Sequence, residues 1–128
     1  MKHVRIYISL PISGHELEER KKKAAQMKDQ VMQAVKTNKL DYISKNGKAV
    51  SLTENNTVVI TPFEIVPDAT DMTYEQVMAK DLEVLMTCDI VVFARHWQYS
   101  KGCRIEFAVA RELGIRVNFE ALEVYGEE

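Results

Sequence analysis

Two acidic residues stand where hydrophobic residues belong, and they are the side chains best suited to chemistry. In the helix predicted over residues 101–113, small and apolar residues recur along one face, and Glu106 lies in the middle of that face. In the helix predicted over residues 72–87, Asp81 interrupts a second apolar stripe in the same way. Burying an ionised carboxylate without partners costs several kcal/mol, so each acid is expected either to have a bonding partner in the core or to border a pocket.

The two stripes define what surrounds these acids. They consist of Gly102, Cys103, Ala110 and Leu113 around Glu106, and of Tyr74, Val77, Met78, Leu82 and Leu85 around Asp81. The purely structural alternative is a core acid bonded to backbone amides or to an arginine such as Arg104 or Arg111. Two such acids on helices flanking one crevice favour a pocket. Enzymes that cleave glycosidic bonds commonly use a pair of carboxyl groups. One attacks or stabilises an oxocarbenium-like centre, and the other delivers a proton to the leaving group.

Strands and helices are predicted to alternate along the chain. Apolar runs rich in β-branched residues predict strands over 4–9, 57–61, 89–94 and 115–119, and one-sided apolar periodicity predicts helices over 15–36, 72–87 and 101–113. This order is typical of an α/β, Rossmann-like or flavodoxin-like three-layer sandwich with a mostly parallel sheet of four to five strands. Asn46-Gly47 predicts an inserted β-hairpin at about 41–52. A single domain is expected over 1–128.

In such folds, ligands bind beyond the carboxyl ends of the strands, where the strand order reverses. The segments that follow the first and third predicted strands, 10–14 and 95–102, are therefore the expected walls of the site.

Composition narrows the choice of partner. The chain has 128 residues, 46% of them hydrophobic and 28% charged, with a net charge of -2, so a broad surface for duplex nucleic acid is not expected. Cys88 and Cys103 have no metal-ligand or redox spacing, and His96 has no partner ligand, so neither a metal nor another cofactor is expected. No segment is suited to membrane insertion or to act as a signal peptide, which predicts a cytoplasmic location.

Three segments resemble the nucleoside 2-deoxyribosyltransferase superfamily, which includes the 2'-deoxynucleoside 5'-monophosphate N-hydrolases. They are Ile6-Tyr7-Ile8-Ser9-Leu10-Pro11-Ile12-Ser13-Gly14, Lys80-Asp81-Leu82 with Cys88-Asp89-Ile90-Val91-Val92, and Ser100-Lys101-Gly102-Cys103-Arg104-Ile105-Glu106. The resemblance implies that Glu106 is a nucleophile that attacks the anomeric carbon, that Tyr7 orients its carboxylate, and that Asp81 donates a proton to the leaving base. The implied reaction is cleavage of an N-glycosidic bond, by hydrolysis or by base exchange.

Ser100 bears on the substrate. By the resemblance, transferases acting on free nucleosides carry an aspartate six residues before the nucleophile, whereas the monophosphate hydrolases carry a serine. A serine at a helix N-terminus favours a 5'-phosphate, and a plain helix cap is its structural alternative. Substrate contacts are accordingly expected at Ser100, Gly102, Ile12, Ser13 and Gly14.

Ser13 departs from the family pattern, since the phosphate hydrolases carry a basic residue there. His15 and Arg20 are candidate replacements that the sequence does not place. Ser13 and Gly14 are expected to open the first helix, with a simple turn as the alternative. Trp97 is expected to stack on a base, with a packing anchor as the alternative.

Other function classes remain open. The same fold supports a nucleotide-binding or sensing module without catalysis, in which the hairpin is a lid or a partner surface. A purely structural domain leaves the two acids unexplained. Apolar residues in the hairpin and in Val117 to Tyr125 predict a homodimer.

Overall fold

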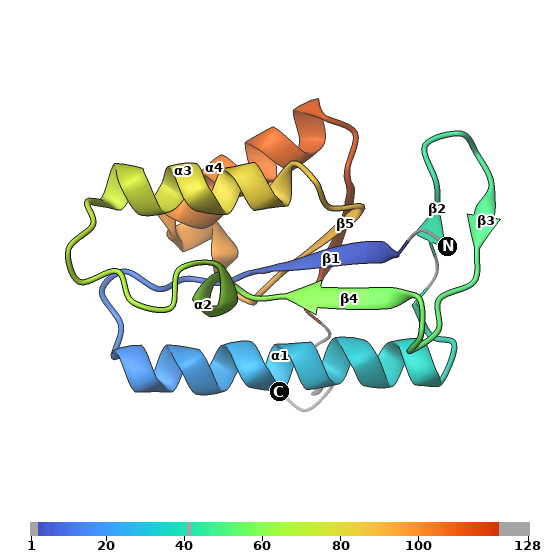
Figure 1. The fold of residues 1–128 in the computed structure, drawn as a ribbon, viewed down its shortest axis with the longest axis horizontal. Coiled ribbons are helices and arrows are strands. Elements are labelled where there is room, and N and C mark those ends of the chain that lie inside the picture. Colours follow the sequence, from blue (N-terminus) through green and yellow to red (C-terminus); the bar gives the residue numbers. More distant parts are fainter. Residues whose placement is uncertain (1–2, 41, 121–128) are drawn as a thin grey trace.

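A parallel sheet forms the centre of the computed structural model, which describes residues 3–40 and 42–120 (Figure 1). Its four strands lie in the order β4-β1-β5-β6, and every neighbouring pair is parallel. They are β1 (Val4–Ser9), β4 (Thr57–Ile60), β5 (Ile90–Phe93) and β6 (Arg116–Phe119). With helices on both faces, this is the predicted three-layer, Rossmann-like arrangement. The order runs from β1 to one edge and then returns past β1 to β5, so the strand order reverses beside β1.

Helices cover the two faces of the sheet (Figure 1). One face carries α1 (Leu17–Lys36), and the other carries α3 (Tyr74–Leu85) and α4 (Lys101–Glu112). The first helix starts two residues later than predicted, because Glu16 is its cap and accepts a hydrogen bond from the backbone N of Glu19 at 3.0 Å.

Two short helices were not predicted from the sequence. Pro62, expected only to end a strand, begins α2 (Pro62–Ile65), because its fixed φ suits the first helical position. The one-turn 3₁₀ helix η1 (Trp97–Tyr99) follows His96, which adopts a left-handed backbone conformation with φ of 66°. This turn decides which of the nearby aromatic rings faces the site described below.

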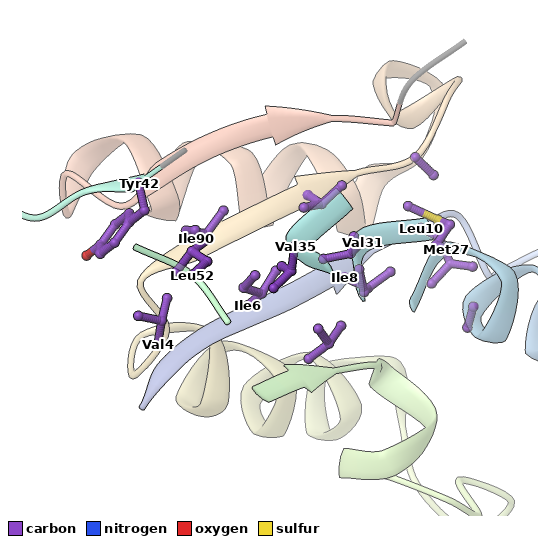
Figure 2. Packing of buried hydrophobic residues seen from close by; sticks show 14 residues of the cluster. Val4, Ile6, Ile8, Leu10, Met27, Val31, Val35, Tyr42, Leu52 and Ile90 are labelled. Atoms are coloured by element: carbon purple, nitrogen blue, oxygen red, sulfur yellow. The ribbon is translucent and has the colours of Figure 1, made fainter. Parts of the chain in front are cut away.

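The side chains of β1 divide between the two faces of the sheet. Ile6 and Ile8 belong to the apolar cluster that packs against α1 (Figure 2). Tyr7, between them, belongs to the cluster on the α3 and α4 side. Because successive side chains of a strand point to opposite faces, Ser9 shares the face of Tyr7. The central strand therefore presents two hydroxyl groups to the helices that carry Asp81 and Glu106.

The predicted hairpin is present as the antiparallel pair β2 (Tyr42–Ile43) and β3 (Ala49–Val50). Tyr42 Oη donates a hydrogen bond to Asp89 Oδ1 at 3.4 Å, just before β5 begins. The hairpin thus lies at the amino ends of the strands, at the opposite end of the sheet from α2 (Figure 1). The hypothesis that it forms a lid over a site at the carboxyl ends is wrong, because it lies too far along the strands.

The C-terminal segment linked above to dimer formation lies only partly within the described residues, since 121–128 fall outside them. Its described part includes Phe119, which is 54% exposed on the edge strand β6. The homodimer stays a prediction. Within residues 3–40 and 42–120, no helix has the length and apolar character needed to span a bilayer.

Candidate active site

A cavity of about 760 Å³ lies at the carboxyl end of β1, between the loop after that strand and the helices α3 and α4. Its floor and walls contain both Asp81 and Glu106. The lining also includes Leu10, Ile12, Ser13, Met72, Tyr74, Val77, Met78, Tyr99, Ser100, Lys101, Gly102 and Cys103. A cavity next to the reversal of strand order is where ligands bind in this class of fold.

Glu106 is held by two hydroxyl groups from β1. Tyr7 Oη donates to Glu106 Oε2 at 2.6 Å, and Ser9 Oγ donates to Glu106 Oε1 at 2.6 Å. Tyr7 and Ser9 are fully buried, and Glu106 is only 5% exposed. Both carboxylate oxygens are thereby fixed in one orientation.

The protonation of this trio follows from burial and hydrogen bonding. Burial raises the pKa of Glu106 above its ordinary value, and the hydrogen bonds from Ser9 and Tyr7, which favour the charged form, offset only part of that rise. Burial and the nearby negative charge of Glu106 raise the pKa of Tyr7 well above its ordinary value. The phenol therefore keeps its proton and serves as a donor to the carboxylate.

Asp81 lines the same cavity but lacks the hydrogen-bond donors that Glu106 has. It is also 5% exposed, but its Oδ1 has no hydrogen-bond partner among the described residues. Burial, and secondarily the charge of Glu106, raise the pKa of Asp81 to about 7. A carboxyl group in this setting favours its protonated form and can donate a proton near neutral pH.

Neither arginine of α4 pairs with these acids. Arg104 Nη1 donates to the carbonyl oxygen of Gln98 at 2.8 Å. Arg111 lies over the ring of Phe107, 5.7 Å from its centroid. Leu113, assigned above to the apolar stripe of Glu106, is 43% exposed at the end of the helix.

Ser100 and Gly102 shape the wall formed by the start of α4. Ser100 caps the helix, with its Oγ accepting from the backbone N of Cys103 at 3.3 Å, and it also lines the cavity. A Cβ atom on Gly102 would lie 3.2 Å from Tyr74 Oη and 3.3 Å from Met78 Cε. Glycine at this position therefore lets α3 pack closely against α4.

The loop after β1 contributes only part of what was expected. Ile12 and Ser13 line the cavity, whereas Gly14, His15 and Arg20 do not. Ser13 and Gly14 form a turn, with Gly14 at φ of 83°, and they do not open the helix because Glu16 caps it. Gly14 serves the backbone conformation of this turn.

Trp97, expected to stack on a base, does not line this cavity. Its ring stacks on Phe107 at a centroid distance of 4.5 Å and lies 5.4 Å from Phe93. The single turn of η1 directs Trp97 into this aromatic cluster and places Tyr99 on the cavity wall instead. These ring contacts agree with the alternative expectation that Trp97 is a packing anchor.

Sequence reasoning missed Ser9, Tyr99 and Lys101 as members of the site. A signal existed for Ser9, which follows Tyr7 by two residues in a strand and must share its face. No local pattern distinguished Tyr99 from Trp97, or Lys101 from the other lysines.

Among the described residues, no group of three or more His, Cys, Asp or Glu side chains is arranged to hold a metal ion. Cys103 lines the cavity as a free, buried thiol. Burial raises the pKa of that thiol, which keeps it neutral.

Comparison with curated proteins gives no match to this chain. A family profile, described as a domain of unknown function (DUF4406), matches residues 4–119. That range contains every strand and helix described above, together with both acids of the cavity. The chain therefore belongs to the DUF4406 family.

Proposed function

We propose that this cavity cleaves the N-glycosidic bond of a 2'-deoxynucleoside 5'-monophosphate or deoxynucleoside, by hydrolysis or by base exchange. One observation carries the proposal: two equally buried acids share the cavity, and only Glu106 has hydrogen-bond donors on both oxygens. Environments that push the pKa values of two carboxyl groups apart divide the roles of nucleophile and acid between them. The resemblance to the nucleoside 2-deoxyribosyltransferase superfamily supports the same assignment.

In the first step, an oxygen of the Glu106 carboxylate attacks the anomeric carbon of the sugar. The bond between that carbon and the base nitrogen breaks, and its electron pair leaves with the base, which takes a proton from Asp81. Tyr7 and Ser9 hold the attacking carboxylate. Each oxygen keeps a free lone pair for attack while it accepts one hydrogen bond.

In the second step, a water molecule attacks the anomeric carbon of the glycosyl ester. The Asp81 carboxylate accepts a proton from that water, and the ester bond breaks to return the Glu106 carboxylate. If a second base occupies the cavity, its nitrogen attacks instead, Asp81 accepts the proton from that nitrogen, and the ester bond breaks to return the Glu106 carboxylate. The same residues therefore serve hydrolysis and base exchange, and access of water or base decides between them.

The test is chromatography of a panel of deoxynucleotides and deoxynucleosides after incubation with the protein. We expect the wild type to release free base, Glu106→Ala to release none, and the variant still to be stabilised thermally by the same ligands. Glu112→Ala removes an exposed carboxylate from the same helix and is the matched control.

Two outcomes would argue against the proposal. Unchanged turnover in Glu106→Ala would remove the mechanism. Thermal stabilisation of the wild type by nucleotides without base release would favour a binding or sensing module. Capture of the sugar by an added acceptor base separates exchange from hydrolysis.

A further inference from the structure

We propose that Lys101 binds the 5'-phosphate of the substrate and makes this cavity selective for deoxynucleoside monophosphates over free deoxynucleosides. The inference rests on the proposed function for the identity of the sugar. It supplies the basic residue that Ser13, His15 and Arg20 do not provide.

Lys101 is the only basic residue among the described residues that line the cavity. No carboxylate of the described residues lies within salt-bridge distance of its ammonium group. Its Nζ lies 5.5 Å from the centroid of the Tyr74 ring, and Tyr74 also lines the cavity. A cation held by an aromatic face keeps its charge available to an anion that enters beside it.

The position of Lys101 in its helix favours the same ligand. It is the first residue of the twelve-residue helix α4, whose first turn contains no acidic residue. A cation at the positive end of a helix dipole is unfavourable unless an anion joins it. The backbone N–H groups of Lys101 and Gly102 have no acceptor within the helix, because they belong to its first turn.

The unpaired carboxyl oxygen of Asp81 is a separate observation that favours ligand binding in this cavity. Asp81 lines the cavity and is only 5% exposed. Its Oδ1 has no hydrogen-bond partner among the described residues. A buried polar oxygen left unpaired is costly, and a donor on a bound molecule removes that cost. A bound molecule with a hydrogen-bond donor near Asp81 Oδ1 would therefore be favoured in this cavity.

The N-terminus of α4 and Glu106 lie on the same helix. Ser100 precedes Glu106 by six residues, which corresponds to about 9 Å along the helix axis. The inference places the anomeric carbon at Glu106 and the 5'-substituent at the N-terminus of α4, where Lys101 also lines the cavity. A phosphate in that position would meet the Lys101 cation and the first-turn N–H groups of α4, and the base would lie on the side of Asp81.

The experiment compares Lys101→Met with the wild type on matched pairs of deoxynucleoside monophosphates and deoxynucleosides. We expect kcat/KM to fall about tenfold or more for the monophosphates, as expected for losing a charge-assisted hydrogen bond, and to stay unchanged for the nucleosides. Methionine keeps the apolar stem, Lys101→Arg should restore most of the preference, and Lys22→Met on α1 removes an equal charge away from the cavity. Equal losses on both substrate classes, or an unchanged preference, would overturn the inference.

A binding measurement separates this inference from the proposed function. Calorimetry with 2-deoxyribose 5-phosphate and with 2-deoxyribose requires no base release. If Lys101→Met loses affinity for the sugar phosphate alone, the inference stands even where the wild type releases no base and the proposed function fails. If the variant binds the sugar phosphate as tightly as the wild type, or if the wild type does not bind it, Lys101 has no such role.

Discussion

Glu106 and Asp81 line one cavity with equal burial, yet Glu106 accepts a hydrogen bond on each oxygen while Oδ1 of Asp81 accepts none among the described residues. No arginine of α4 neutralises either acid. Two carboxyl groups that interact in a buried site titrate as a pair. Burial raises the pKa of both acids, and only Glu106 has hydrogen bonds that favour its charged form. This asymmetry is the arrangement that the proposed chemistry requires.

Base release should decrease as the pH rises through about 7, because Asp81 then loses the proton that the proposed mechanism transfers to the leaving base. Asp81→Asn cannot donate that proton and should lower kcat about 100-fold, with a flattened alkaline limb in the pH–rate profile. Glu83→Gln, an exposed acid on the same helix, is the control and should leave the profile unchanged. If the rate of Asp81→Asn still falls at alkaline pH, the titrating group is not Asp81.

The stability of the protein should fall between pH 4 and pH 7. The folded-state pKa of Asp81 is raised from 3.8 to about 7, so in this window the folded protein holds a proton that the unfolded chain has released. The stabilisation is complete below the lower value and is lost as the pH rises through the higher one. A rise of about three pKa units corresponds to a loss of about 4 kcal/mol in the free energy of unfolding.

Urea denaturation at several pH values measures this dependence. Asp81→Asn cannot ionise, so its free energy of unfolding should decline less over the same window. Parallel curves for the wild type and the variant would show that Asp81 titrates normally.

Ser9→Ala should move the acid limb of the pH–rate profile to higher pH. The variant loses the donor to Glu106 Oε1, which favours the carboxylate, so the pKa of Glu106 rises and more protein is inactive at low pH. Tyr7→Phe should act in the same direction through Oε2. We expect kcat to fall about tenfold or more for each variant.

A buried hydroxyl elsewhere provides the control for Ser9 and Tyr7. Thr57, 7% exposed at the start of β4, donates to Asn56 Oδ1 outside the cavity. Thr57→Val should reduce stability without moving the acid limb. If Ser9→Ala leaves that limb in place, Ser9 has only a structural role.

The elements of the fold were predictable because their apolar periodicity is strong. The continuous apolar run over 89–94 is typical of a strand covered on both faces, and its central residues form β5 (Ile90–Phe93). Asp81 and Glu106 were found for the related reason that each breaks an apolar stripe. Ser9 was missed because a serine in a buried strand breaks no pattern.

The remaining errors arise from tertiary arrangement. Trp97 and Tyr99 are two residues apart, and only the single 3₁₀ turn and the ring of Phe107 decide which of them reaches the cavity. The hairpin was predicted from Asn46-Gly47, but its place at the amino ends of the strands follows from contacts such as that of Tyr42 with Asp89. Local sequence carries no information about either choice.

Gly102→Ala should weaken substrate binding more than it changes stability. The added Cβ would lie 3.2 Å from Tyr74 Oη and 3.3 Å from Met78 Cε, closer than most such contacts, so these two side chains must shift within the cavity that they line. Alanine stabilises a helix by about 1 kcal/mol relative to glycine, which offsets much of the steric cost. We expect KM to rise about tenfold while the free energy of unfolding changes by less than about 1 kcal/mol. Tyr74→Phe removes the Oη atom, so the double variant Gly102→Ala with Tyr74→Phe should recover part of the lost affinity. An unchanged KM in Gly102→Ala would mean that the substrate does not approach this wall.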